Sequence, residues 1–293
     1  MRNDREMMEI ILKTAKEDER IRAAYMNGSR TNPNAPKDIF QDYDIVFVVS
    51  ETASFLKVRT WLRVFGNLIM MQEPDKNDFD RGIDINFNKS YGFLMLFTDG
   101  NRIDLRIQVK EEMLKLYGND KLTVPLLDKD QILPPISPPS DIDYRVQEPT
   151  EGEFNSYTND FLWCLQNVAK GIWRKELPYA KGMFEYATRD SLVKMVNWWI
   201  GIDHDFQVST GKLGKYFQDF LPEPYWKLYI KTYCNGDYSN MWDSLFISCE
   251  LFRILGEEVA RRFNFTYPID DHRNMIRYLE HIRNLPSDAN EIY

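Results

Sequence analysis

The stretch of sequence that decides the fold spans residues 42–49 and reads DYDIVFVV. Its last five residues are β-branched or aromatic, which predicts a buried β-strand. Asp42 and Asp44 stand at the start of this strand. Residues two apart on a strand face the same side, so the two carboxylates repel each other unless a cation lies between them. A hard cation such as Mg²⁺ prefers such oxygen ligands, although a D-x-D pair alone is also typical of a solvated turn.

A second stretch, RIDLRIQV at residues 102–109, alternates between polar and apolar side chains and predicts another strand. Its apolar face holds Ile103, Leu105, Ile107 and Val109, and its polar face holds Arg102, Asp104, Arg106 and Gln108. Asp104 therefore lies in the middle of a strand on the polar face. If this strand pairs beside the first, three carboxylates converge, an arrangement that suits one or two Mg²⁺ ions and phosphoryl transfer.

A glycine-serine pair precedes both strands. Residues 21–26 predict a short strand that ends in Asn27-Gly28-Ser29. Gly28 lets the backbone approach a ligand closely, and Ser29 offers a hydroxyl and an N–H to a phosphate, to which a helix beginning soon afterwards would add donors. Arg30 follows and would neutralise phosphate charge. A lone Gly-Ser pair carries little information, but its separation of twelve residues from the D-x-D pair makes the combination more specific.

The rest of the first part of the chain mixes helices and strands. Its predicted elements are a helix at residues 6–16, a helix that includes residues 61–65, a strand at residues 68–72, and a hairpin of residues 93–97 and 102–109. Asp99-Gly100 provides the turn of this hairpin.

A proline-rich segment divides the chain. Residues 134–149 hold five prolines, which block helix interiors and central strands and indicate an extended connector. We therefore expect an α+β fold with a first domain at residues 1–135, a linker at 136–149 and a helical domain at 150–293. In the helical domain apolar residues recur at spacings of three or four, and six of the seven tryptophans lie there, which favours a core between helices.

Composition and charge exclude several classes of protein. No apolar run reaches the roughly 20 residues needed to span a bilayer, and residues 1–9 lack the apolar region of a signal peptide, so we expect a cytoplasmic protein without a membrane partner. The three cysteines and three histidines lack the spacing of disulfide or metal frameworks. A net charge of -8 disfavours nucleic acid and slightly favours a cationic substrate. The sequence does not fix the oligomeric state, and a monomer is favoured.

The Gly-Ser pair, the spacer, the D-x-D pair and a third aspartate on a later strand together resemble the DNA-polymerase-β-like nucleotidyltransferase superfamily. Within it, longer strings along nearly the whole chain resemble the aminoglycoside 6-adenylyltransferases, which modify streptomycin. The D-x-D module points only to the superfamily, and the longer strings point to the streptomycin branch. These strings are Gly28-Ser-Arg30, Pro36-Lys-Asp38, Gln41-Asp-Tyr-Asp-Ile45, Gly66-Asn67, Ile69-Met-Met-Gln72, Leu94-Met-Leu-Phe97, Ile103-Asp-Leu105, Asp128-Lys-Asp130, Asp141-Ile-Asp-Tyr144, Lys170-Gly171 and Arg174-Lys-Glu176.

The resemblance implies a fold and an activity. The fold is an N-terminal nucleotidyltransferase domain, a mixed β-sheet flanked by helices, followed by a C-terminal helical bundle that binds substrate, with ATP and the antibiotic meeting in the cleft between them. The activity is Mg²⁺-dependent transfer of AMP from ATP to the 6-hydroxyl of streptomycin, which releases pyrophosphate and inactivates the antibiotic.

The same resemblance assigns residues to the site. The predicted catalytic and metal-binding residues are Asp42, Asp44 and Asp104, and the predicted nucleotide-binding residues are Gly28, Ser29, Arg30, Lys170 and Arg174. Asp104 is either a third metal ligand or the general base that takes the hydroxyl proton. Lys170 and Arg174 lie four apart on one helix face, which either clamps phosphate or is a solvated basic face. Candidate acids for the guanidinium groups of streptomycin, each also typical of surface charge, are Glu176, Glu185 and Asp190.

Two other functions stay open. One is nucleotidyl transfer to a different acceptor, such as a protein side chain or an RNA end, and the negative charge disfavours RNA. The other is a nucleotide-binding module that has lost catalysis, which the complete set of three aspartates disfavours. The negative charge also suggests a hypothesis that an acidic cleft steers the cationic antibiotic into the site.

Overall fold

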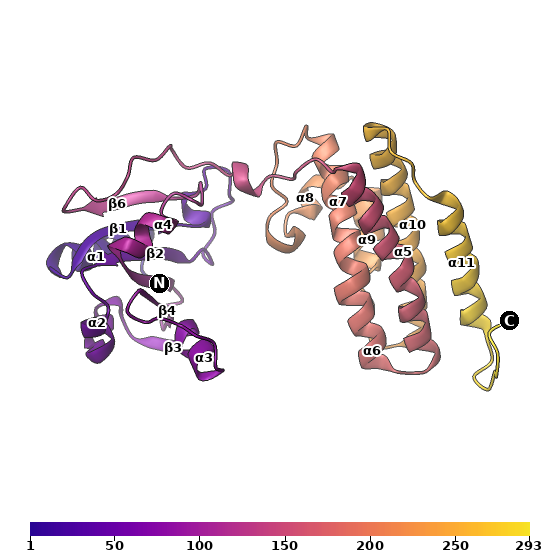
Figure 1. Cartoon of the computed structure of the whole chain (residues 1–293), viewed down its shortest axis with the longest axis horizontal. Helices are drawn as coiled ribbons and strands as arrows, with labels where there is room; N and C mark the ends of the chain where they lie inside the picture. Colours follow the sequence, from indigo (N-terminus) through magenta and orange to yellow (C-terminus); the bar gives the residue numbers. More distant parts are fainter. The chain divides into compact units, whose positions relative to one another are not determined.

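The chain divides between Asp143 and Tyr144, inside the proline-rich segment. The computed structural model describes all 293 residues, and in it residues Met1–Asp143 and Tyr144–Tyr293 form two units (Figure 1). The first unit holds a six-stranded mixed sheet with helices, and the second is helical. The predicted α+β fold is therefore confirmed. No helix is long and apolar enough to cross a membrane.

The sheet of the first unit places the two acidic strands side by side. Its strand order is β3-β4-β5-β2-β1-β6, and β2 and β5 pair in parallel while every other pair is antiparallel. The strands are β1 (Ile21–Asn27), β2 (Tyr43–Val49), β3 (Leu68–Gln72), β4 (Ser90–Phe97), β5 (Arg102–Val109) and β6 (Val124–Asp128). The predicted neighbourhood of the two strands and the predicted β4–β5 hairpin are thus present. Asp42 itself lies one residue before β2 begins.

Helices cover one face of the sheet and part of the other. The helical elements of this unit are α1 (Asp4–Glu17), η1 (Ser29–Thr31), α2 (Ala53–Lys57), η2 (Arg59–Phe65), α3 (Pro74–Asp80) and α4 (Lys110–Leu116). Asn3 begins α1 with a capping box that Glu6 completes, which satisfies two otherwise unpaired N–H groups. The stretch around Trp61 is helical as expected, but it is a 3₁₀-helix, η2.

The alternation of β2 explains where its acids point. Tyr43, Ile45 and Phe47 belong to the core that α1 and η2 help to form. Val46 and Val48 face the other way, into a smaller core with Met113 of α4. Asp44 shares that second face, so its carboxylate emerges on the side of the sheet that α4 covers only in part.

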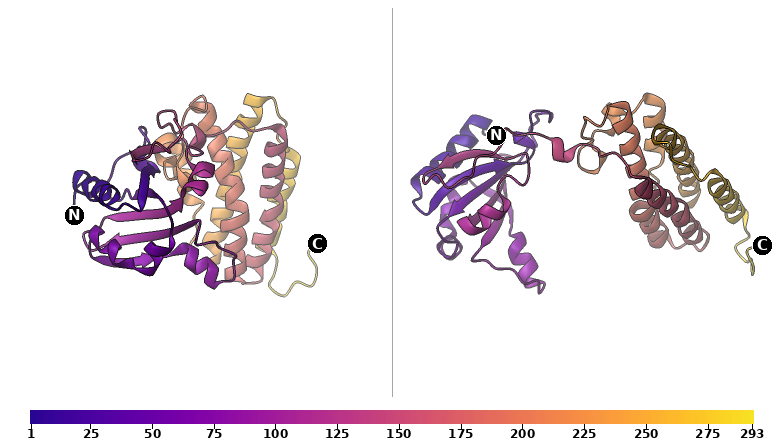
Figure 2. Two further views of the ribbon diagram at one scale, coloured as in Figure 1. Left: turned by 60° about the vertical axis from the view of Figure 1, so that its left-hand side comes forward. Right: turned by 45° about the horizontal axis from the view of Figure 1, so that its top comes forward.

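The second unit is built from long helices that pack against one another. Its helices are α5 (Glu151–Trp173), α6 (Leu177–Gly182), a π-helical stretch (Met183–Thr188), α7 (Arg189–Asp203), η5 (Lys212–Gly214), α8 (Phe217–Phe220), α9 (Glu223–Lys231), α10 (Tyr238–Phe263) and α11 (Ile269–Asn284), and a further turn, η3 (Ile142–Tyr144), spans the boundary. Figure 2 shows α5, α7 and α10 side by side. Phe161 of α5 stacks on Phe252 of α10 with ring centroids 3.8 Å apart. The expected aromatic core between helices is present.

Candidate active site

The three aspartates come together because β2 and β5 run in parallel and in register. Asp44 is paired with Asp104, and Tyr43 with Ile103. Asp42 lies just ahead of β2, two residues before Asp44. One carboxylate oxygen from each of Asp42, Asp44 and Asp104 lies within 4.8 Å of the others. Three hard oxygen donors this close form a donor set that fits a divalent cation such as Mg²⁺.

The electrostatics of this cluster also favour a bound cation. The pKa of Asp44 is raised to about 7, first because burial disfavours its charged form and then because Asp42 and Asp104 add negative charge beside it. A cation bound beside Asp44 would offset the repulsion from the two neighbouring carboxylates and favour the ionised form of its carboxyl group. The residues present therefore fit a metal ion.

Arg102 is a member of the cluster to which the sequence assigned no role. Its guanidinium donates two hydrogen bonds to Asp104, with Nε 2.7 Å from Oδ1 and Nη2 2.5 Å from Oδ2. Its Nε also lies 3.7 Å from Oδ2 of Asp42. In the sequence, the only indication of a role for Arg102 was that it shares the polar face of β5 with Asp104, two residues away. Arg102 thus balances part of the negative charge of two of the three acids.

Gly28 touches the cluster directly. Its φ is +79°, a conformation that favours glycine, and a Cβ built there would lie 2.0 Å from Oδ2 of Asp44. Close backbone approach is therefore required at this position, and the neighbour is the Asp44 carboxylate; the predicted approach of Gly28 to a ligand stays a prediction. The expected helix after Ser29 is only the three-residue turn η1. The condition under which a helix N-terminus would add phosphate donors is therefore not met.

Arg30 is held by contacts within the first unit. Its Nε donates to the carbonyl of Asp42 at 2.9 Å and its Nη2 to the carbonyl of Gln41 at 2.8 Å. Its Nη1 donates to Oδ1 of Asp4 at 2.6 Å, and its guanidinium lies 3.7 Å from the ring centroid of Tyr43. These contacts fix the backbone that leads into β2. Binding of phosphate by Arg30 stays a prediction, and it would compete with them.

A cavity of about 460 Å³ opens beside the acids on the same face of the sheet. Gly28, Asp44 and Asp104 line it, together with Arg106 and Gln108 of β5. Gln108 donates to the hydroxyl of Tyr25 at 2.6 Å, while its own Oε1 is buried without a partner. A cavity of this size is typical of small-ligand sites. Arg106 brings a cationic side chain to it that the sequence placed on this face without a role.

The other predicted phosphate-binding residues lie in the second unit. Lys170, near the end of α5, donates to Oδ1 of Asn167 at 3.0 Å and lies 5.8 Å from the ring centroid of Tyr179. Arg174 is the exposed residue that caps the C-terminus of α5. Their role in binding the triphosphate stays a prediction.

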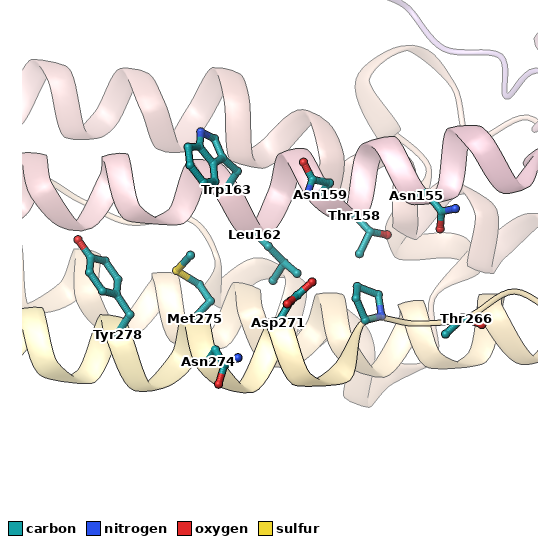
Figure 3. A pocket seen from close by; sticks show the side chains of 11 residues that line it. Asn155, Thr158, Asn159, Leu162, Trp163, Thr266, Asp271, Asn274, Met275 and Tyr278 are labelled. Carbon is teal, nitrogen blue, oxygen red and sulfur yellow. The ribbon is translucent and has the colours of Figure 1, made fainter.

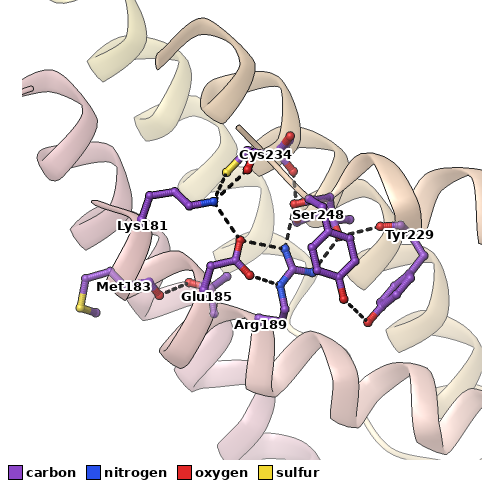
Figure 4. A network of polar contacts seen from close by, with 11 residues as sticks. Lys181, Met183, Glu185, Arg189, Tyr229, Cys234 and Ser248 are labelled. Carbon is purple, nitrogen blue, oxygen red and sulfur yellow. Dashed lines mark hydrogen bonds and ion pairs between the residues drawn. The ribbon is translucent and has the colours of Figure 1, made fainter. Parts of the chain in front are cut away.

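The candidate acid Glu185 already binds a guanidinium, that of Arg189 (Figure 4). The π-helical stretch and its flanks place Glu185 four residues after Lys181 and four before Arg189, and both cations contact its carboxylate. Arg189 also donates to the hydroxyl and the carbonyl of Thr232, both at 2.9 Å. The charge of Glu185 is thus balanced inside the unit, whereas Glu176 and Asp190 are exposed.

Comparison with known proteins identifies the family of this chain. The chain matches the family described as Streptomycin adenylyltransferase over residues 1–282. The chain belongs to this family. Among its relatives in the streptomycin adenylyltransferase family, it is 38% identical to an aminoglycoside 6-adenylyltransferase of Campylobacter jejuni over 275 residues, 93% of each protein. It is 35% identical to an aminoglycoside 6-adenylyltransferase of Bacillus subtilis, covering 96% of this chain and 98% of the relative. A crystal structure of an aminoglycoside 6-adenyltransferase from Bacillus subtilis matches 97% of this chain and 100% of that one at 30% identity, with a TM-score of 0.48.

Proposed function

We propose that this protein is an aminoglycoside 6-adenylyltransferase that transfers AMP from ATP to the 6-hydroxyl of streptomycin, releases pyrophosphate and so inactivates the antibiotic. The observation that carries the proposal is the cluster of Asp42, Asp44 and Asp104 in a chain that belongs to the streptomycin adenylyltransferase family along nearly its whole length. Its relatives at 31–38% identity carry the name of this activity.

In the proposed site Asp42 and Asp44 hold Mg²⁺. The bound ion would neutralise charge on the phosphates of ATP during transfer. Parallel pairing of β2 with β5 fixes the spacing of Asp44 and Asp104, and Gly28 lets the backbone approach Asp44. The hydroxyl of the acceptor attacks the α-phosphorus of ATP, the bond to the leaving pyrophosphate breaks, and the hydroxyl proton passes to a base.

Asp104 has two possible roles, and kinetics separate them. As a third metal ligand, its change to Asn raises the Mg²⁺ concentration needed for half-maximal rate. As the general base, the same change lowers kcat and removes the lower limb of the pH–rate profile, while the Mg²⁺ dependence stays as it was. Its place among the donor oxygens favours the role of ligand.

The triphosphate is assigned to cationic and N–H groups of both units. We infer that Ser29 contributes its hydroxyl and N–H, and that Lys170 and Arg174 supply cations from the helical unit. Arg106, which lines the cavity beside Asp104, is an additional cation of the first unit. Single changes of these residues to Ala are expected to raise the KM for ATP more than the KM for streptomycin.

The decisive experiment incubates the protein with Mg²⁺, labelled ATP and a panel of aminoglycosides, and follows pyrophosphate and adenylylated drug. Turnover with streptomycin supports the proposal. Labelling of a protein or RNA, with no turnover of any drug, would assign a different acceptor. Binding of ATP without transfer to any acceptor would leave only a nucleotide-binding module.

Two further inferences concern the protein's setting. We infer that it acts in the cytoplasm, where its co-substrate ATP is available, and as a monomer. Light scattering coupled to size exclusion, with and without ATP and streptomycin, measures the second point directly. A dimer mass under either condition would overturn it.

A further inference from the structure

A groove in the helical unit lies apart from every residue assigned above. It is formed by α5, by α11 and by the segment that leads into α11, and it encloses about 680 Å³ (Figure 3). Leu162 of α5 and Met275 of α11 point into it from opposite helices. A cavity of this volume with an apolar floor and polar groups around it is typical of small-ligand sites.

The polar groups of the groove have no partners within the protein. Asn155 and Asn159 of α5 and Asp271 and Asn274 of α11 line it without a side-chain hydrogen bond or ion pair. The hydroxyl oxygen of Thr158, also in the groove wall, is buried with no hydrogen-bond partner. Buried polar atoms in folded proteins are almost always paired, so the Thr158 hydroxyl is the group of this wall that indicates a polar occupant. The side chains of Asn155, Asn159, Asp271 and Asn274 are exposed and therefore accessible to a ligand.

An exposed indole lies at the same groove. The side chain of Trp163 is 66% exposed, whereas Trp198 and Trp242 are 1% and 7% exposed in the core of the same unit. Trp163 stacks on no other ring, although it sits on α5 only one residue from the buried Leu162. An indole left open beside unpaired amides offers a flat face to a ring or a cation.

The charge of the groove decides which ligand it fits. Of its eleven lining residues only Asp271 is charged, and none is Lys or Arg. A triphosphate would meet no cation there, so ATP is excluded. The unpaired amides suit hydroxyl groups, Asp271 suits an ammonium or guanidinium group, and Trp163 suits the face of a sugar ring.

We propose that the α5–α11 groove binds an amino-sugar ring of the aminoglycoside acceptor, and this rests on the proposed function. Asn155, Asn159 and Asn274 would hydrogen-bond the ring hydroxyls, and Asp271 would pair with a cationic substituent. The groove is then a specificity site: it contributes to binding of the antibiotic and leaves ATP binding unaffected.

The test compares Asp271→Asn with Asp270→Asn in the full-length protein. The control variant Asp270→Asn removes the same charge one residue away. The side chain of Asp270 is 87% exposed and lies outside the groove. We expect Asp271→Asn to raise the KM for streptomycin on the order of tenfold, as expected for loss of a charge-assisted hydrogen bond. The KM for ATP and kcat stay near wild type, and Asp270→Asn changes none of the three. Asn159→Ala and Trp163→Ala are expected to shift the KM for streptomycin in the same direction.

Two further measurements keep the outcome clear. Thermal unfolding of each variant shows whether the helical unit is intact, and calorimetric titration of streptomycin without ATP reports binding alone. Equal KM values for streptomycin in Asp271→Asn and Asp270→Asn, with wild-type turnover of the drug, would overturn the groove and leave the proposed function standing. A shift in oligomeric mass or unfolding temperature without a change in that KM would also overturn it, since the groove would then serve assembly or stability and not binding of the antibiotic. Absence of any drug turnover by the wild type would instead refute the proposed function.

Discussion

The pKa of Asp44 gives a quantitative prediction about stability. In the folded, metal-free protein it is raised from 3.8 to about 7 by burial and by Asp42 and Asp104. Below the unfolded value both states hold the proton, and the group has no effect on the free energy of unfolding. As pH rises towards 7 the unfolded chain ionises while the folded chain does not, so the stability of the folded state falls. One pKa unit corresponds to about 1.4 kcal/mol, so this shift of roughly three units costs about 4 kcal/mol above pH 7.

Replacing the carboxyl by an amide removes this pH dependence. In EDTA, the free energy of unfolding of Asp44→Asn relative to wild type is expected to rise by about 3–4 kcal/mol between pH 4 and pH 8. Urea unfolding of both proteins across this range measures the difference at each pH. The same variant is expected to lose adenylyl transfer by about a hundredfold or more, because a metal ligand contributes several kcal/mol to the transition state.

Asp99→Asn provides a control of opposite sign. The pKa of Asp99 is lowered, chiefly by its hydrogen bond from Arg2, which lies 2.6 Å away. A lowered folded pKa contributes stability above the unfolded value, so this variant is expected to be destabilised at neutral pH and to approach wild type in acid. A gap between Asp44→Asn and wild type that stays constant or narrows as pH rises would refute the account of a repelling, buried cluster.

Three other predictions follow from named contacts, and a fourth follows from the net charge. Gly28→Ala places a Cβ 2.0 Å from Oδ2 of Asp44 at φ +79°, so adenylyl transfer is expected to fall by about a hundredfold and stability by about 1–3 kcal/mol in urea unfolding; near-wild-type transfer would contradict this. Arg30→Lys keeps the charge but not the donors to two carbonyls, so it is expected to raise the Mg²⁺ concentration for half-maximal rate; a raised KM for ATP alone would assign Arg30 to phosphate. Arg189→Met leaves Glu185 without its main partner, which is expected to cost about 3 kcal/mol of stability in urea. With a net charge of -8, kcat/KM for streptomycin is expected to fall as ionic strength rises, and a salt-independent value would refute steering.

The parts of the fold that sequence could predict are those governed by local periodicity. The apolar run 45–49 and the alternation of 102–109 predict β2 and β5, and the Asp99-Gly100 turn joins β5 to β4. The meeting of Asp44 with Asp104 was conditional on the pairing of these two strands, and the parallel register of β2 and β5 in the structure places the two residues side by side. The 3₁₀ conformation of η2 and the π-helical stretch at Met183–Thr188 were not predictable, since packing selects them over the α-helix that the same residues would allow.

The contacts of the site that the sequence did not predict depend on the conformations of long side chains. Arg102 was visible on the polar face of β5, but its bidentate contact with Asp104 depends on a rotamer that no spacing encodes. Arg30 was assigned to phosphate because cations near a Gly-Ser turn suit anions. That assignment stays a prediction, but the sequence did not show that its guanidinium contacts two carbonyls and Asp4 of α1, a residue 26 positions away. Such long-range contacts appear only when the helix and the sheet are packed.

The same contacts explain how an unfavourable cluster is held in place. A buried strand would be more stable with an apolar residue at position 44, and three carboxylates within 4.8 Å repel one another. Arg30 fixes the backbone ahead of β2, Arg102 neutralises Asp104, and Gly28 leaves the space that Asp44 fills. Arg30 and Gly28 restrain the cluster without occupying a carboxylate oxygen, whereas Arg102 binds both oxygens of Asp104. Three specific contacts thus hold together a cluster of carboxylates that repel one another. Selection for stability alone would favour loss of this cluster, so we expect that the protein uses it to bind a cation.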